Sequence, residues 1–274
     1  MSKSKVFTTP SKAYRDDRFI RSPQARPVRI LAEYLDPQNR FEEHGVQDTI
    51  LFFGSARISD RDDVEAEIAA LRAAGDDETQ AQKKLGLVKY YDATRELAGR
   101  LTRWSDEISD EGGRRFVICT GAGPGIMEAA NRGAAEAGGE TVGLGISLPF
   151  EAGNNPWVTE HLSFEFHYFF TRKFWFLYPA KALVIMPGGF GTLDELFETL
   201  TLVQTQKMTK RLPVVLFGTE YWDKILNLDA MVEFGTISPG DLDLLYRTDS
   251  IDEAFAYITK ELAEHALPEP GGRM

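Results

Sequence analysis

Apolar positions follow two alternating patterns between residues 49 and 264. Short continuous apolar runs predict strands that are buried on both faces of a sheet. The longer segments between them carry apolar residues at helical spacing. This alternation predicts an α/β fold, a doubly wound parallel sheet with helices on both faces. The expected strands are 49–53, 116–119, 142–146, 182–186 and 214–217, with a short one at 162–164, and the expected helices are 61–106, 127–137, 171–178 and 192–206.

The N-terminal segment departs from this alternation. Residues 1–45 are polar and rich in Arg, Asp and Pro, so we expect an extension with one short helix near 28–34. This extension is either a partly ordered arm or an arm that packs on a partner subunit.

The rest of the chain is expected to form one domain over residues 46–266, followed by a C-terminal tail at 267–274. A helical insert occupies about 59–105, and Gly75 with its acidic neighbours divides it into an αα-hairpin. Residues 221–264 are expected to be mostly helical.

The strongest motif is the turn at 187–195, Pro-Gly-Gly-Phe-Gly-Thr-Leu-Asp-Glu, between an expected strand and an expected helix. Its three glycines bring backbone N–H groups close to a ligand, and the helix dipole favours an anion there. The motif predicts a phosphate cradle, for which a tight turn without a ligand is the alternative. We also expect Thr192 to cap the helix, with Glu195 completing a capping box. The expected cradle residues are Gly188, Gly189, Phe190, Gly191 and Thr192.

A second glycine-rich turn, Thr-Gly-Ala-Gly-Pro-Gly at 120–125, also joins a strand to a helix. Its spacing departs from the dinucleotide fingerprint, and no acidic residue follows the next strand to hold an adenosine ribose, so it supports NAD only weakly. We expect Gly123 and Gly125 to approach a ligand closely. Glu128 either points into the site or only complements the helix dipole.

Two shorter segments supply further polar candidates. Ser55 and Arg57 follow the first strand, where they either contact a ligand or serve the local turn. Arg172 and Lys173 interrupt an aromatic stretch. Because a buried arginine needs an anionic partner, Arg172 faces either a ligand phosphate or carboxylate, or a structural ion pair.

Composition restricts the classes of function. A net charge of −11 disfavours nucleic-acid binding but allows a small phosphorylated ligand that local donors hold. One cysteine excludes a disulfide within the chain, and the scattered histidines have no metal-ligand spacing, so we expect no metal and no cofactor. No secretory signal or membrane-length apolar stretch is visible, which predicts a cytoplasmic protein without a membrane partner.

The 187–195 motif, the glycine-rich turn leading to Glu128, and the Arg172-Lys173 pair together resemble the LONELY GUY (LOG) family, long labelled possible lysine decarboxylase, in its longer bacterial form. The resemblance spans about residues 48–220, although Asp194 stands where plant members usually carry glutamate. It implies a Rossmann-like fold and a phosphoribohydrolase that releases a base, such as a cytokinin or adenine, and ribose 5-phosphate from a nucleoside 5′-monophosphate. Members are commonly homodimers, and some assemble further.

The resemblance also implies roles for individual residues. Arg172 and Glu195 would form the catalytic pair, and Glu128 and Lys173 would bind substrate. Glycoside cleavage develops positive charge on the ribose, which a carboxylate stabilises while it directs a water molecule. We expect the phosphate cradle to bring the ribose within reach of Glu195.

Three other functions compete with this prediction. A pyridoxal-phosphate decarboxylase needs a Schiff-base lysine, for which Lys173 is the only candidate. A non-catalytic carrier of a nucleotide or phosphorylated cofactor, similar to the molybdenum-cofactor carriers, needs only the glycine-rich turns. A DNA-binding module is disfavoured by the charge. The sequence leaves the identity of the base open.

Overall fold

The computed structural model describes residues 9–109, 113–148 and 153–272 of the chain. Within these ranges, seven strands form one parallel sheet in the order β4-β3-β2-β1-β5-β6-β7. The predicted doubly wound parallel sheet is confirmed. The strands are β1 (Thr49–Phe53), β2 (Val117–Thr120), β3 (Thr141–Ile146), β4 (Ser163–Phe166), β5 (Ala180–Ile185), β6 (Val214–Phe217) and β7 (Leu245–Thr248).

The order of the strands places a topological switch point between β1 and β5. The chain first adds strands outward from β1 to β4, then returns to the other side of β1 with β5. Loops that leave neighbouring strands in opposite directions open a crevice at such a point, and ligands bind there. The two loops are joined directly, because the Ser55 N–H donates to the Pro187 carbonyl at 3.0 Å.

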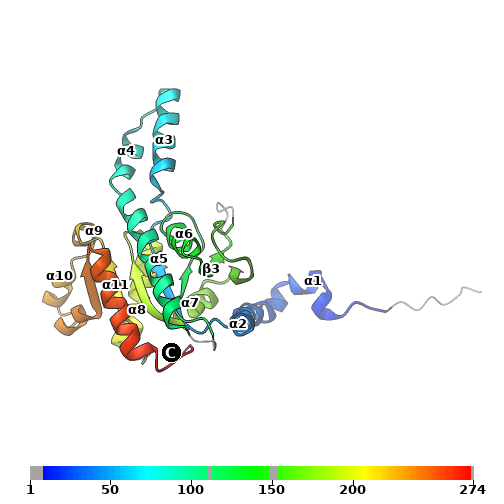
Figure 1. Ribbon diagram of the computed structural model, residues 1–274. Coiled ribbons are helices and arrows are strands. Elements are labelled where there is room, and N and C mark those ends of the chain that lie inside the picture. The colour runs from blue at the N-terminus through cyan, green and yellow to red at the C-terminus, as the bar shows by residue number, and fades with distance from the viewer. Residues whose placement is uncertain (1–8, 110–112, 149–152, 273–274) are drawn as a thin grey trace, which may run out of the picture.

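Helices cover both faces of the sheet (Figure 1). One apolar cluster joins α5, α6 and α11 to one face, and a second joins α2, α7 and α8 to the other. Every side chain of β1 and β5 is buried, as continuous apolar strands require. The helices are α1 (Asp17–Ile20), α2 (Arg26–Glu43), α3 (Arg61–Ala74), α4 (Thr79–Leu85), α5 (Val88–Ile108), α6 (Ile126–Glu136), α7 (Phe169–Leu177), α8 (Phe190–Gln204), α9 (Thr219–Ile225), α10 (Leu228–Glu233) and α11 (Ile251–Glu261).

The helical insert forms a hairpin of α3 and α4 that projects from the sheet (Figure 1). Gly75 ends α3 with φ of +75°, a conformation that favours glycine, so the predicted break is confirmed. A small apolar cluster of its own holds the hairpin together, with Val64, Ile68, Ala81 and Val88 at its centre. The outer limits that we expected for the domain, 46 and 266, stay a prediction.

One expectation for the N-terminal segment was wrong, and one strand near the C-terminal end was missed. The N-terminal helix is α2, which runs over 18 residues instead of 28–34 and contains Pro37. It persists because its aromatic residues pack on the body, with Phe41 5.4 Å from Phe164 and Tyr34 5.9 Å from Trp175 between ring centroids. The segment 221–264 is mostly helical, as predicted, but it also contains β7. The sequence analysis missed this strand because it is four residues long, includes Arg247 and Thr248, and lies at the sheet edge beside β6.

Candidate functional site

A cavity of about 1200 Å³ lies at the carboxyl ends of the strands that flank the switch point. The turns after β1, β2 and β5 form its floor, while α4, α7 and α9 contribute walls. Nine of the predicted site residues line it: Ser55, Gly123, Arg172, Gly188, Gly189, Phe190, Gly191, Thr192 and Glu195.

The turn after β5 leads directly into α8, whose first residue is Phe190. Gly189 is the N-cap, and no side chain caps the helix. The expected capping box of Thr192 and Glu195 is therefore wrong, because the helix begins two residues before Thr192. The first N–H groups of α8 point along the helix axis at the cavity without a partner inside the helix, which favours an anion at this position.

The three glycines of this turn differ in what surrounds them. A Cβ on Gly188 would lie 2.1 Å from Thr192 Oγ1, so the packing of the turn itself requires glycine there. A Cβ on Gly189 or Gly191 would meet no atom within 4 Å. Protein packing alone does not explain these two glycines, whereas a ligand seated against the backbone does. Tyr221, which the sequence analysis missed, donates its hydroxyl to the Gly188 carbonyl at 2.8 Å and steadies the turn.

Glu195 lies one and a half turns along α8, on the side that lines the cavity. Its side chain is only 8% exposed, and its Oε2 atom has no hydrogen-bond partner among the described residues. Burial raises the pKa of Glu195 to about 7, and the positive charges of Lys173 and Arg172 offset this only partly. A carboxylate near its pKa at neutral pH suits proton transfer.

Lys173 does not line the cavity. Its Nζ atom lies 2.8 Å from Asp194 Oδ2, 2.6 Å from Glu198 Oε2 and 3.7 Å from Glu195 Oε1. The lysine thus neutralises a row of carboxylates on α8. Substrate contact by Lys173 stays a prediction.

Arg172 lies on the opposite wall of the cavity, on α7. Its Nε donates to the Leu144 carbonyl at 2.7 Å, and its guanidinium lies over the Phe176 ring at 4.8 Å. A terminal nitrogen also donates to the Gly121 carbonyl at 3.4 Å. A Cβ on Gly121 would lie 2.5 Å from that nitrogen, so glycine there allows the guanidinium to approach.

Two other predicted site residues lie outside the cavity lining. Gly125, with φ of +71°, packs against the loop after β1, where a Cβ would lie 2.5 Å from the Ser55 carbonyl. Burial raises the pKa of Glu128, and the negative charges of Asp63 and Asp60 raise it further. Glu128 therefore faces the start of the insert.

Comparison with known proteins shows which family this chain resembles. Residues 127–258 match the family described as possible lysine decarboxylase. The chain is 34% identical over 89 residues to cytokinin riboside 5′-monophosphate phosphoribohydrolase LOG3 of Arabidopsis thaliana, covering 32% of this chain and 39% of that protein. It is 30% identical over 95 residues to the probable phosphoribohydrolase LOG4 of Oryza sativa subsp. japonica, covering 34% and 40%. Over these segments the chain is similar to the LOG family.

The chain thus spans about two fifths of the length of these LOG relatives. The molybdenum cofactor carrier protein of Chlamydomonas reinhardtii is 17% identical, with a TM-score of 0.43 over 80% of this chain and 99% of that chain. The corresponding binding protein of Rippkaea orientalis is also 17% identical, with a TM-score of 0.42 over 78% and 98%. Likeness at this level carries no functional argument.

The part of the chain that the structure describes contains no helix able to span a membrane. Among the same residues, no group of three or more His, Cys, Asp and Glu side chains is arranged to hold a metal ion.

The insert also contributes to the main cavity, which nothing in the sequence signalled. Gln80, Lys83, Lys84 and Leu87 line the wall that faces the 187–195 turn. Lys84 is paired with Glu67 at 2.6 Å. An insertion distant in sequence from the 187–195 turn therefore shapes part of the cavity, through α4 and Leu87.

The helix that carries Arg172 is held in place by Glu33 on α2. The Glu33 carboxylate accepts the backbone N–H groups of His167 and Tyr168 at 2.9 and 3.2 Å, and the Thr171 hydroxyl at 2.8 Å. It therefore caps the start of α7 from a different element.

Replacement of Glu33 by alanine is expected to lower the free energy of unfolding by about 1–2 kcal/mol, as the loss of a helix cap does. Amide hydrogen exchange at the start of α7 should accelerate in the same variant. Denaturant titration and exchange measured by mass spectrometry check both effects. Glu43→Ala, an exposed glutamate at the end of the same helix, is the matched control, and equal behaviour of the two variants would remove Glu33 from this role.

Proposed function

We propose that the protein is a nucleoside 5′-monophosphate phosphoribohydrolase. It hydrolyses the N-glycosidic bond of AMP or of a cytokinin riboside 5′-monophosphate, and water and the nucleotide become free base and ribose 5-phosphate. The observation that carries the proposal is the buried carboxylate of Glu195, which has an unpartnered oxygen on the cavity side of the helix whose first N–H groups form an anion site. The activity named for the plant LOG relatives supports the same reaction.

In this proposal, the substrate lies across the switch point. Its phosphate binds at the start of α8, against Gly189 and Gly191, and its ribose lies beside Glu195. As the bond to the base breaks, positive charge develops on the sugar, and the negative carboxylate stabilises it. The same carboxylate accepts a proton from the water that adds to C1′, while the departing base takes up a proton. Binding energy from the phosphate thereby serves to orient the sugar.

The surrounding charges divide their roles. Arg172 faces the ligand from α7 and favours the ionised form of Glu195. Lys173 acts through Glu195, because it screens that carboxylate from Asp194 and Glu198 on the same helix. Substrate binding by Glu128 stays a prediction. A cytoplasmic location and a homodimeric or higher assembly stay predictions.

The test is release of free base by the purified full-length chain. AMP, isopentenyladenosine 5′-monophosphate and adenosine are incubated with the protein, and bases are separated by chromatography. We expect equimolar base and ribose 5-phosphate from at least one monophosphate and none from adenosine, which lacks the phosphate. Binding of the monophosphates without any release of base would contradict the proposal and indicate a carrier.

A further inference from the structure

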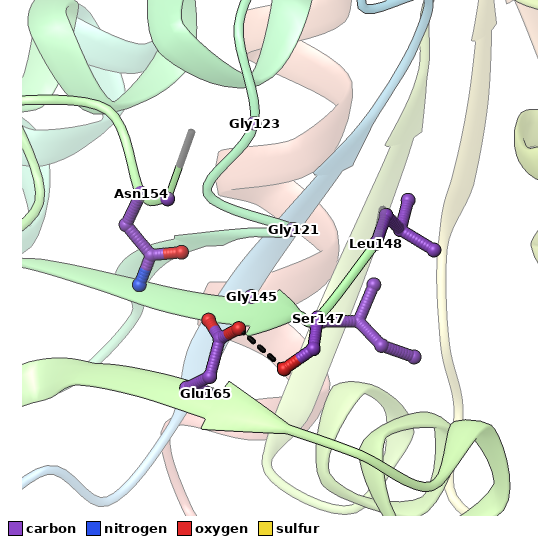
Figure 2. Close-up of a pocket in the computed structure, with 9 residues that line it drawn as sticks. Gly121, Gly123, Gly145, Ser147, Leu148, Asn154 and Glu165 are labelled. Carbon is purple, nitrogen blue, oxygen red and sulfur yellow. Dashed lines mark hydrogen bonds between the residues drawn. The ribbon is translucent and has the colours of Figure 1, made fainter. Parts of the chain in front are cut away.

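A second, smaller pocket of about 120 Å³ lies at the carboxyl ends of β3 and β4 (Figure 2). It adjoins the main cavity, because four residues line both: Gly121, Gly123, Ile146 and Leu148. Since a water molecule occupies about 30 Å³ in the liquid, the pocket has room for a few heavy atoms, such as one edge of a ring.

Two oxygen atoms converge in this pocket above Gly145. The Asn154 amide nitrogen donates to Ser163 Oγ at 2.7 Å and to the Phe164 carbonyl at 3.1 Å, which fixes the orientation of the amide. A Cβ on Gly145 would lie 2.1 Å from Asn154 Oδ1 and 3.1 Å from Glu165 Oε2. Only glycine at this position leaves both oxygens exposed to the same small space.

The Glu165 carboxylate is held by one of its two oxygens. Ser147 donates its hydroxyl to Oε1 at 2.7 Å, drawn as the dashed line in Figure 2. Among the described residues, no other hydrogen bond to this carboxylate occurs, and no lysine or arginine lines the pocket. The pocket therefore presents one charged and one neutral acceptor to a group that donates hydrogen bonds.

The position of the pocket relates it to the phosphate turn. β3 and β5 are three strands apart in the sheet order, about 14 Å at the usual strand spacing. A mononucleotide in extended form has comparable reach. With the phosphate at the start of α8 and the ribose at Glu195, the far edge of the base points toward β3.

We propose that Asn154 and Glu165 receive the primary amine of an adenine or cytosine ring, and that this pocket selects the base. A primary amine offers two N–H donors on one atom, which matches two converging acceptors. An oxo group in the same place brings an acceptor against a carboxylate, and a substituent on the amine removes one donor and adds bulk. The inference rests on the proposed function and chooses among its substrates, favouring AMP over N6-substituted cytokinin nucleotides.

The test measures binding separately from hydrolysis. Equilibrium dialysis of the full-length chain gives the Kd for AMP, N6-methyl-AMP and IMP, and base release is followed in parallel samples. We expect AMP to bind at least about tenfold more tightly than the other two, because each competitor leaves an acceptor of the pocket without its donor.

Variants assign the preference to residues. Glu165→Gln should reduce the preference for AMP over IMP to about threefold or less, and Ser147→Ala, which releases the carboxylate, should give an intermediate value. Glu160→Gln, an exposed glutamate outside both pockets, should leave the ratio unchanged. Equal affinity for AMP and IMP, or an unchanged ratio in Glu165→Gln, overturns this inference even if base is released. Failure to bind any of the three nucleotides overturns the proposed function as well.

Discussion

Replacement of Glu195 by glutamine is expected to lower kcat/KM for nucleotide hydrolysis about a thousandfold, because glutamine keeps the size of the side chain but removes the negative charge and the proton acceptor. In the unmodified protein, kcat/KM should rise as the pH increases through about 7, where this carboxyl ionises. Initial rates over pH 5–9 check both statements. Loss of less than tenfold in the variant, or a rate that falls with rising pH in this range, would contradict the assigned role.

The neighbouring Glu198 gives a control for the electrostatics. Its negative charge raises the pKa of Glu195, so Glu198→Gln should move the midpoint of the pH profile to a lower pH while hydrolysis persists. A profile that does not move would show that the ionisation belongs to another group.

The same substitution of Glu195 is expected to stabilise the fold at high pH. The pKa of this carboxyl is near 4.5 in an unfolded chain and about 7 in the folded protein, so the folded state binds the proton more tightly. Stability is therefore lost as the pH rises from about 4.5 through about 7, and the cost above that range is about 3 kcal/mol. Glu195→Gln should be more stable than the unmodified protein at pH 8 and nearly equal to it at pH 4.5, as thermal unfolding at the two pH values will show. A stability loss at pH 8 would mean that the ionised carboxylate is better solvated or paired than its burial implies.

Replacement of Gly191 by alanine is expected to weaken nucleotide binding about a hundredfold while leaving the fold as stable as before, or more stable. A Cβ at this position meets no protein atom within 4 Å, and alanine in a helix is favoured over glycine by up to about 1 kcal/mol. The same methyl group would occupy the space in which we place the phosphate. Isothermal titration with AMP and thermal unfolding measure the two effects.

Gly240 is the matched control for this experiment. It also lies near the start of a short helix, a Cβ there also meets no atom within 4 Å, and it is far from the cavity lining. Gly240→Ala should therefore leave binding intact. If Gly191→Ala binds AMP as tightly as Gly240→Ala does, the turn at 187–195 does not hold the phosphate.

The sequence by itself determined the core of the fold, and it predicted an anion site at its strongest turn. A short, continuous apolar run is typical of a strand that is covered on both faces of a sheet. The runs at 49–53 and 214–217 therefore predicted β1 and β6 at their observed bounds. Three glycines between a strand and a helix likewise predicted where backbone N–H groups would be exposed. In both cases the signal is local, because it depends on residues adjacent in the chain.

Tertiary structure decided the features that depend on contacts between distant segments. The length of α2 and the existence of β7 follow from packing on α7 and pairing with β6. Lys173 does not line the cavity but pairs with three carboxylates on α8, an arrangement that the sequence did not reveal. Asn154 and Glu165 carry no motif. Glu165 lies beside Gly145 because β3 and β4 pair. Asn154 is held there by its hydrogen bonds to Ser163 and Phe164. Sequence spacing cannot reveal such contacts, because the groups that bury or pair with each side chain come from segments far away in the chain.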